Sequence, residues 1–152
     1  METMLKSIAV PAGVGRSTES LPGETVILKA VSTDTDGAYT LVEVINEPQS
    51  GTPLHLHRHE DVGFYILEGT FAFQIGDRAM TATAGWFMTA PRGVPRSYKN
   101  IGTTPARMLA LFVPAGMEKL FEDLLKLTEA GTSNMDNIVA VSAKHGIEEV
   151  PI

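Results

Sequence analysis

The sequence predicts a mainly β protein, a sandwich or barrel of short strands followed by one or two C-terminal helices. Short apolar or alternating runs recur up to residue 113, and turn-forming residues separate them. Beyond residue 114 the apolar residues adopt helical spacing instead. Strands and helices do not alternate along the chain, so a parallel sheet with crossover helices is not expected.

The expected strands follow one another at short intervals, as in sandwiches and barrels. Turn signals such as TDTDG, EPQSG and PRG lie between them. In chain order the runs are ETVILKA (24–30), YTLVEVI (39–45), PLHLH (53–57), VGFYILE (62–68), TFAFQIG (70–76), GWFMTA (85–90), PRSYKN (95–100) and RMLALFV (107–113).

The segment from 115 to 130 predicts a helix, because its apolar residues recur at intervals of three and four. They are Met117, Leu120, Phe121, Leu124, Leu125 and Leu127. Gly131 can end this helix in the left-handed conformation, and a second helix is expected from about 134 to 145. No linker is long enough to detach the helices. We therefore expect one domain over residues 1–152, with the barrel over about 20–113 and the helices over about 115–145.

Composition excludes several classes of function. The chain has 152 residues and a net charge of −6, which argues against binding to nucleic acid or to an anionic membrane surface. It has no cysteine, so disulfides, thiol nucleophiles and thiolate metal ligands are absent. No apolar run approaches the roughly 20 residues of a membrane helix. We expect a soluble, cytoplasmic protein.

Two histidines on one strand are the first candidate for a functional site. Residues two apart on a strand point to the same face, so His55 and His57 project together from the run PLHLH. Two neutral imidazoles on a rigid strand form half of a site for a divalent metal.

The residues that follow this pair extend the pattern. Beyond His57 come four residues, Val62, six residues and Gly69, and a second skeleton runs from Gly85 to Asn100 in GWFMTAPRGVPRSYKN. Both resemble the motifs of the cupin superfamily, G-x5-H-x-H-x3,4-E-x6-G and G-x5-P-x-G-x2-H-x3-N. The stretch FYILEGTFAFQIGD is similar to that of small single-domain cupins of the quercetinase-like group. This resemblance implies a jelly-roll β-barrel with its site inside.

In the cupin family, two histidines and a glutamate of the first motif and one histidine of the second bind iron, manganese, nickel, copper or zinc. His55 and His57 match the two histidines. Val62 stands at the glutamate position and Arg96 at the last histidine position, while the opening glycine falls at Gln49. The resemblance therefore implies a metal site with two of its four ligands replaced.

Three residues after the histidine pair could complete such a site. His59 and Glu60 would lie in the turn after the strand. Asp61 is one residue early, so its side chain reaches the site only through a bulge or a turn. On a straight strand His55 and His59 would be about 13 Å apart, too far to share a metal bonded at about 2 Å to each nitrogen. The expected cofactor is accordingly either none or one divalent metal on His55 and His57.

A guanidinium at position 96 would change the charge of the pocket, because it stays protonated. Beside two histidines, Arg96 would disfavour a divalent cation and would donate two parallel hydrogen bonds to a carboxylate, phosphate or sulfate. Alternatively it pairs with an acid such as Glu60 or Asp61 at the rim.

The other residues of the pocket wall are inferred from strand parity and from the apolar character of ligand pockets. The expected ligand-binding residues are His55, His57, Arg96, Val62, Phe64 and Tyr98.

The leading functional hypothesis is a cupin barrel that binds a small organic molecule, an anionic one included, beside a degenerate metal site. A second is a metal-dependent dioxygenase or isomerase of the quercetinase-like type. A third is metal-free acid–base catalysis, with a histidine as base and Arg96 stabilising a developing anion, so the candidate catalytic residues are His55, His57 and Arg96. A fourth is a barrel with no ligand. The resemblance also implies a homodimer.

Overall fold

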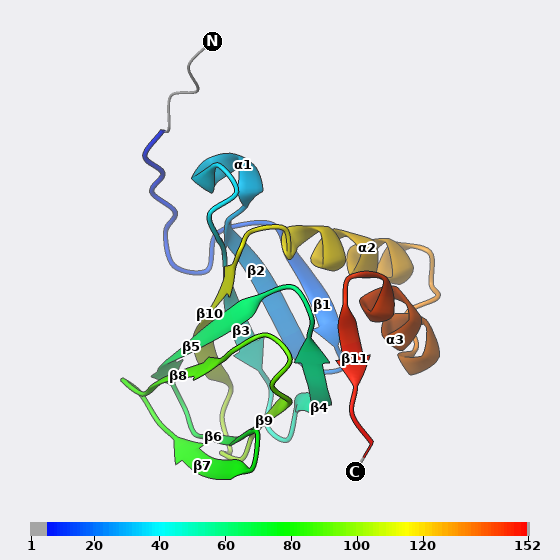
Figure 1. Cartoon of the computed structure of the whole chain (residues 1–152). Coiled ribbons are helices and arrows are strands. Elements are labelled where there is room, and N and C mark those ends of the chain that lie inside the picture. Colours follow the sequence, from blue (N-terminus) through cyan, green and yellow to red (C-terminus); the bar gives the residue numbers. More distant parts are fainter. Residues whose placement is uncertain (1–5, 152) are drawn as a thin grey trace.

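Two antiparallel sheets pack against each other, with the C-terminal helices beside them (Figure 1). The computed structural model describes residues 6–151 and confirms the mainly β jelly-roll fold. One sheet has the order β1 (Ser17–Leu21), β2 (Glu24–Ala30), β3 (Thr40–Asn46), β10 (Ala106–Val113), β5 (Asp61–Glu68), β8 (Phe87–Ala90). The other has the order β11 (Ile147–Glu149), β4 (Gly51–His57), β9 (Arg96–Asn100), β6 (Phe71–Ile75), β7 (Arg78–Ala82).

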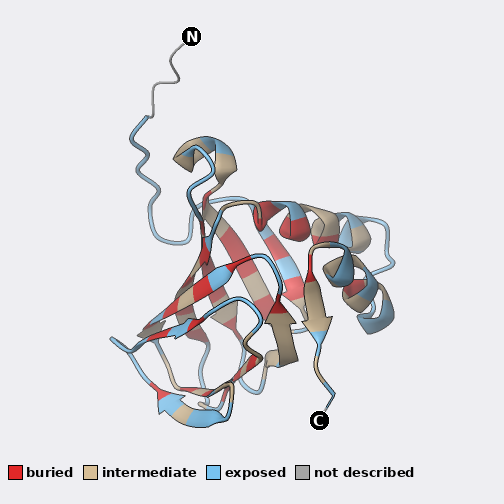
Figure 2. Cartoon of the chain, in the orientation of Figure 1, coloured by how far each residue is buried: buried red, intermediate tan, exposed pale blue. Residues whose placement is uncertain are grey.

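The core forms where the inner faces of the two sheets meet. Buried and less buried residues alternate along β5, β9 and β10, and Figure 2 shows the buried residues as red bands separated by tan and blue ones along the strands. Four aromatic rings cluster there with centroids 5.2–6.1 Å apart, close enough for tilted and edge-to-face contacts. They belong to Phe64, Phe71, Phe73 and Tyr98.

Both expected helices are present as α2 (Glu118–Glu129) and α3 (Met135–Lys144). The apolar face of α2 packs on the barrel through Leu120 and Phe121, which are buried. The start of α2 is fixed by the buried Glu118, whose carboxylate accepts hydrogen bonds from Ser32 Oγ at 2.6 Å and Thr40 Oγ1 at 2.7 Å. Ser32 belongs to a short helix, α1 (Ser32–Thr35), that the periodicity did not predict.

Three strands also escaped prediction. β1 reads STESL and turns Thr18 and Ser20 inward, so it lacks an apolar alternation. β7 is largely exposed and β11 has only three residues. β11 follows the helices and pairs with β4 in the second sheet, so strand pairing continues beyond the barrel segment expected to end near residue 113.

The turn before β4 preserves a glycine-like conformation without glycine. Gln49, at the position of the motif's opening glycine, has φ of 70°, in the left-handed region that costs an L residue about 1–2 kcal/mol. At Gly51 a Cβ would stand 1.9 Å from the Tyr98 carbonyl oxygen. The absence of a side chain at Gly51 therefore lets β4 lie close against β9 and fixes the start of the strand that carries the histidines.

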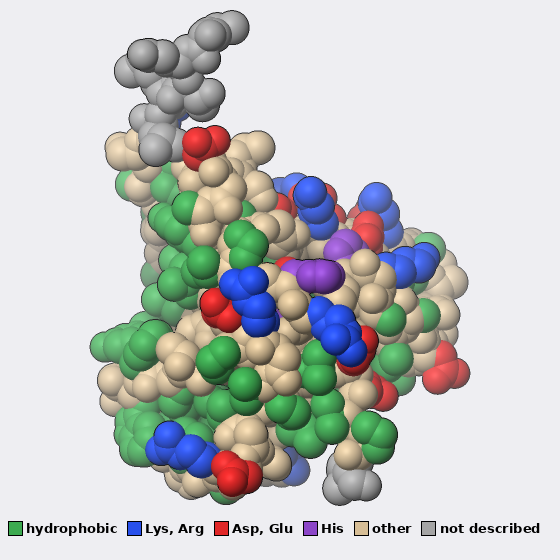
Figure 3. Space-filling model, in the orientation of Figure 1, with side chains coloured by type: hydrophobic (Ala, Val, Ile, Leu, Met, Phe, Trp, Pro, Cys, Tyr) green, Lys and Arg blue, Asp and Glu red, His purple; other side chains and the backbone are tan. Residues whose placement is uncertain are grey.

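The outer face of the first sheet exposes large apolar side chains. Tyr65 and Phe87 are register partners on β5 and β8 and are 44% and 61% exposed. Leu109 on β10 is the next residue in the same row. Hydrophobic side chains gather at this side of the molecule in Figure 3. Within residues 6–151, no helix is long and apolar enough to cross a membrane.

Candidate functional site: a cavity beside the histidine pair

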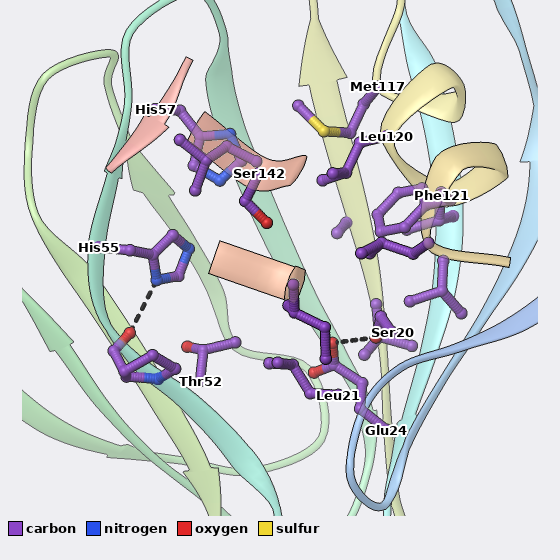
Figure 4. A pocket seen from close by; sticks show the side chains of 18 of the residues that line it. Ser20, Leu21, Glu24, Thr52, His55, His57, Met117, Leu120, Phe121 and Ser142 are labelled. Atoms are coloured by element: carbon purple, nitrogen blue, oxygen red, sulfur yellow. Dashed lines mark hydrogen bonds between the residues drawn. The ribbon is translucent and has the colours of Figure 1, made fainter. Parts of the chain in front are cut away.

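A cavity of about 130 Å³ lies between the inner face of the barrel and the C-terminal helices. β1 to β5, β9 and β10 form one side, and α2, α3 and β11 form the other. Most of the lining is apolar, with Phe112, Leu120 and Phe121 prominent. Figure 4 shows the imidazoles of His55 and His57 pointing into it. The polar lining residues are Ser20, Glu24, Thr52, His55, His57, Tyr98, Ser142 and Glu149.

The two imidazoles lie side by side on β4, with ring centroids 5.3 Å apart. Burial is the main cause that lowers the pKa of His55 from 6.5 to about 3, and the neighbouring His57 and Arg96 lower it further. Burial also lowers the pKa of His57, and the nearby Glu60 only partly offsets this effect. Both rings are therefore neutral near pH 7.

The Nδ1 contacts determine which nitrogen of each ring faces the cavity as an acceptor. His55 Nδ1 lies 2.8 Å from the Pro53 carbonyl oxygen, and His57 Nδ1 lies 3.3 Å from Glu60 Oε1. Because these oxygens accept, each Nδ1 carries the ring's proton. In the described residues neither Nε2 has a protein partner, and neither is a buried unpaired atom. Two unprotonated nitrogens are thus available to a ligand.

Arg96 is fully buried, but its guanidinium is bound to the loop before its own strand. Its Nε donates to the Val94 carbonyl at 3.0 Å, and its Nη2 donates to the carbonyls of Ala90 and Pro91, each at 3.1 Å. Nη1 is buried without a partner in residues 6–151. Burial lowers the pKa of Arg96 to about 10, so it remains a cation. Within the described chain, Arg96 does not line the cavity.

The other expected pocket residues divide into two groups. Phe64 and Tyr98 line the cavity together with the histidines. Val62 is buried on β5, only 2% exposed, and like Arg96 is absent from the lining that residues 6–151 provide.

Sequence reasoning missed Glu24, a buried acid in the cavity wall. Its carboxylate accepts hydrogen bonds from Ser20 Oγ at 2.5 Å, Asn46 Nδ2 at 3.1 Å and Tyr98 Oη at 2.5 Å. Burial and the charge of Glu24 raise the pKa of Tyr98 well above its usual range, so the phenol stays a donor. One signal could have found Glu24: it shares strand parity with the buried Val26.

The residues that could complete a metal site are directed elsewhere. His59 is exposed and lies against Gly146, where a Cβ would come within 2.5 Å of its ring. Asp61 is exposed and paired with Arg92 at 3.2 Å, and Glu60 faces the protonated side of His57. Among residues 6–151, no three His, Asp or Glu side chains are placed to hold one metal ion. The donor set in the described chain does not fit a resident divalent metal.

Part of the chain matches a known protein family. A family model described as a cupin domain matches residues 42–112, which span β3 to β10. This segment is therefore similar to the cupin domain, and it carries the histidine strand and most strands of the jelly roll.

Individual relatives are distant. Mannose-1-phosphate guanylyltransferase 2 of Escherichia coli O157:H7 is 28% identical over 78 residues, which cover 51% of this chain but only 16% of that protein. KdgF from Halomonas sp. superposes with a TM-score of 0.67 at 15% identity, over 75% of this chain and 99% of that one. An RmlC-like cupin from Shewanella frigidimarina NCIMB 400 gives 0.63 at 18% identity, over 76% and 99%. At these identities the structures share the fold.

Proposed function

We propose that this protein binds a small organic molecule in the cavity beside His55 and His57, without a metal. The observation that carries the proposal is a pair of neutral imidazoles pointing into a largely apolar cavity. Ligand pockets combine an apolar lining with a few placed polar groups in this way. The two free Nε2 atoms accept hydrogen bonds, so the ligand presents a donor such as a hydroxyl group to them.

The changes at Val62 and Arg96 support a degenerate metal site. An apolar side chain replaces a carboxylate, and a buried cation stands near the histidines, where it opposes a second cation. The second hypothesis, a quercetinase-like dioxygenase or isomerase, needs a third ligand from His59, Glu60 or Asp61. The contacts of these residues with Gly146, His57 and Arg92 weigh against it.

The sequence-based hypothesis of an anionic ligand required the guanidinium of Arg96 to face the cavity. Its guanidinium is occupied by three backbone carbonyls and lies outside the cavity lining that residues 6–151 form. The proposal therefore gives Arg96 the role of holding the loop between β8 and β9, and leaves recognition to the histidines and the other polar residues of the cavity.

Benzyl alcohol is a suitable probe, because a comparable apolar cavity of about 150 Å³ holds a benzene ring. We expect saturable binding in a chemical-shift titration, with the largest shifts in β4 and α3. Ser142→Trp would fill the cavity from α3 and abolish binding. Ala140→Trp, on the exposed side of the same helix, is the matched control and should bind as the unmodified protein does. Equal binding by both variants would refute the cavity as the site.

Metal-independent proton transfer is a second candidate function, favoured by the contact between Glu60 and His57. A buried carboxylate at Nδ1 orients the imidazole and stabilises it once Nε2 has taken a proton. A small ketone tests this: we expect deuterium exchange at the α-carbon of acetophenone in D2O, through removal of that proton by Nε2 and return of a deuteron. The exchange should resist EDTA and be lost in His57→Ala. Exchange that persists in His57→Ala would exclude this function.

A further inference from the structure

The cavity has an unbalanced charge. Two carboxylates line it, those of Glu24 and Glu149, and within residues 6–151 no lysine or arginine does. The histidines do not compensate, because burial keeps both neutral. The side chains around the cavity therefore favour a positive group over a negative one.

Inside the cavity, the preference for a positively charged group comes from Glu24. It is 4% exposed, whereas Glu149 lies exposed at the end of β11. In the described residues no Lys, Arg or His side chain forms an ion pair with Glu24, and its three partners are a hydroxyl, an amide and a phenol. A buried carboxylate without a cation is costly, and a cation that arrives with the ligand removes part of this cost.

The carboxylate also has room for a further donor. Two of its three hydrogen bonds, from Asn46 and Tyr98, end on Oε2, and only the one from Ser20 ends on Oε1. A carboxylate offers about four acceptor positions, so one on Oε1 remains.

Glu24 and the histidines lie at different ends of the site. In Figure 4, His55 and His57 project from one side of the cavity and Glu24 lies across it, near Ser20. Leu120 and Phe121 form an apolar wall of the same cavity. The geometry selects a ligand with an apolar body and polar groups at two ends.

We propose that the natural ligand is a small amine with an apolar body, whose ammonium group binds the carboxylate of Glu24. The inference rests on the proposed function and adds the class of ligand. An ammonium supplies the positive charge that Glu24 has no partner for, and an N–H donor for the acceptor position that remains on Oε1. A hydroxyl or second donor at the other end of such a ligand would bind Nε2 of the histidines.

Three probes of nearly equal size test the inference: benzylamine, benzyl alcohol and benzoate. Titrations at neutral pH should show benzylamine binding at least tenfold more tightly than the alcohol, about 1.4 kcal/mol, and benzoate binding most weakly. This ranking uses the unmodified protein and does not depend on any variant folding. A ranking in which benzoate equals or exceeds benzylamine would overturn the inference.

Glu24→Gln assigns the effect to one residue. It keeps the shape of the side chain and should abolish the preference for the amine, so that benzylamine no longer binds more tightly than benzyl alcohol. Glu149→Gln removes the other lining carboxylate, the exposed one, and should leave the preference in place. If benzyl alcohol binds and charge makes no difference, only the inference fails. If none of the three probes binds, the proposed function fails with it.

Discussion

Arg96 lies directly opposite His55 in the antiparallel pair of β9 and β4, yet the two side chains serve different parts of the molecule. The imidazole of His55 points into the cavity, while the guanidinium of Arg96 is bound to backbone carbonyls between Ala90 and Val94. A fixed positive charge thus stands next to the strand that would supply two metal ligands.

The first prediction concerns metal content. The purified protein should keep far less than one equivalent of iron, manganese, nickel, copper or zinc after dialysis, because two nitrogens beside a cation make a weak site. The double variant Val62→Glu with Arg96→His restores a carboxylate and an imidazole and should bind close to one zinc per chain. Elemental analysis measures both.

The control for this experiment is Val62→Glu alone, which retains the guanidinium and should bind zinc weakly. Circular dichroism must show that each variant is folded, since Arg96 donates three hydrogen bonds. One metal per unmodified chain, lost in His55→Ala, would instead mean that residues after the strand complete the site.

The second prediction concerns stability in acid. His55 has its pKa lowered to about 3, so the folded state keeps it neutral while the unfolded chain takes up a proton below about pH 6.5. Its stability contribution is fully present above pH 6.5 and is lost as the pH falls toward 3. Between pH 7 and pH 5 the loss from this residue is about 2 kcal/mol, measurable by urea unfolding.

His55→Asn should remove that part of the pH dependence, because its amide can still donate to the Pro53 carbonyl. His59→Asn, on an exposed neighbour, is the matched control and should keep the contribution of His55 to the pH dependence, because His55 is still present. An unaltered slope in His55→Asn would show that this imidazole titrates in the folded protein as it does in water.

The third prediction concerns the turn before β4. Gln49 has φ of 70°, so Gln49→Gly relieves left-handed strain, and the greater freedom of glycine in the unfolded chain offsets part of the gain. We expect a net stabilisation of about 0.5–1 kcal/mol, seen as a higher Tm. Glu47→Gly, two residues earlier and with no such strain, should lower Tm.

The fourth prediction concerns a second copy of the chain. The exposed parts of Tyr65 and Phe87 alone would bury roughly 200 Å² per copy, about a quarter of the roughly 800 Å² per partner in a standard interface. The adjacent Glu43 is already paired with Arg107 at 2.8 Å, so no unpaired charge need be buried with them. We expect a homodimer through this face.

Light scattering coupled to size exclusion measures the mass of the particle. Tyr65→Ser with Phe87→Ser should give a monomer, and Ile101→Ser, an equally exposed apolar residue in the loop after β9, should remain a dimer. A dimer that survives the double variant would place the interface elsewhere.

The fold could be predicted because its signals are local. Alternation along β5 and β10 and the three-and-four spacing of α2 are properties of neighbouring residues, and the paired spacing of His55 and His57 sets them on one face. These features depend on backbone geometry alone.

The site could be predicted only in part, because its remaining features depend on contacts between distant segments. Tyr98 donates a hydrogen bond to Glu24, 74 positions away in the sequence, and no local sequence pattern predicts this contact. Arg96 could be placed inward by parity, but only the path of the loop decides that carbonyls bind its guanidinium. The cavity itself lies between the barrel and helices, and its position depends on how they dock.

The pairing of β11 with β4 couples two parts of the molecule that are otherwise separate. β11 follows α3 through Gly146 and pairs Ile147 with His57 and Glu149 with His55. One continuous segment thus forms a wall of the cavity and the hydrogen-bonded neighbour of the histidine strand. Outward displacement of α3 would pull β11 away from β4 and break the hydrogen bonds between these two strands. The rate of hydrogen exchange at the β4 amides therefore measures how often this wall of the cavity opens.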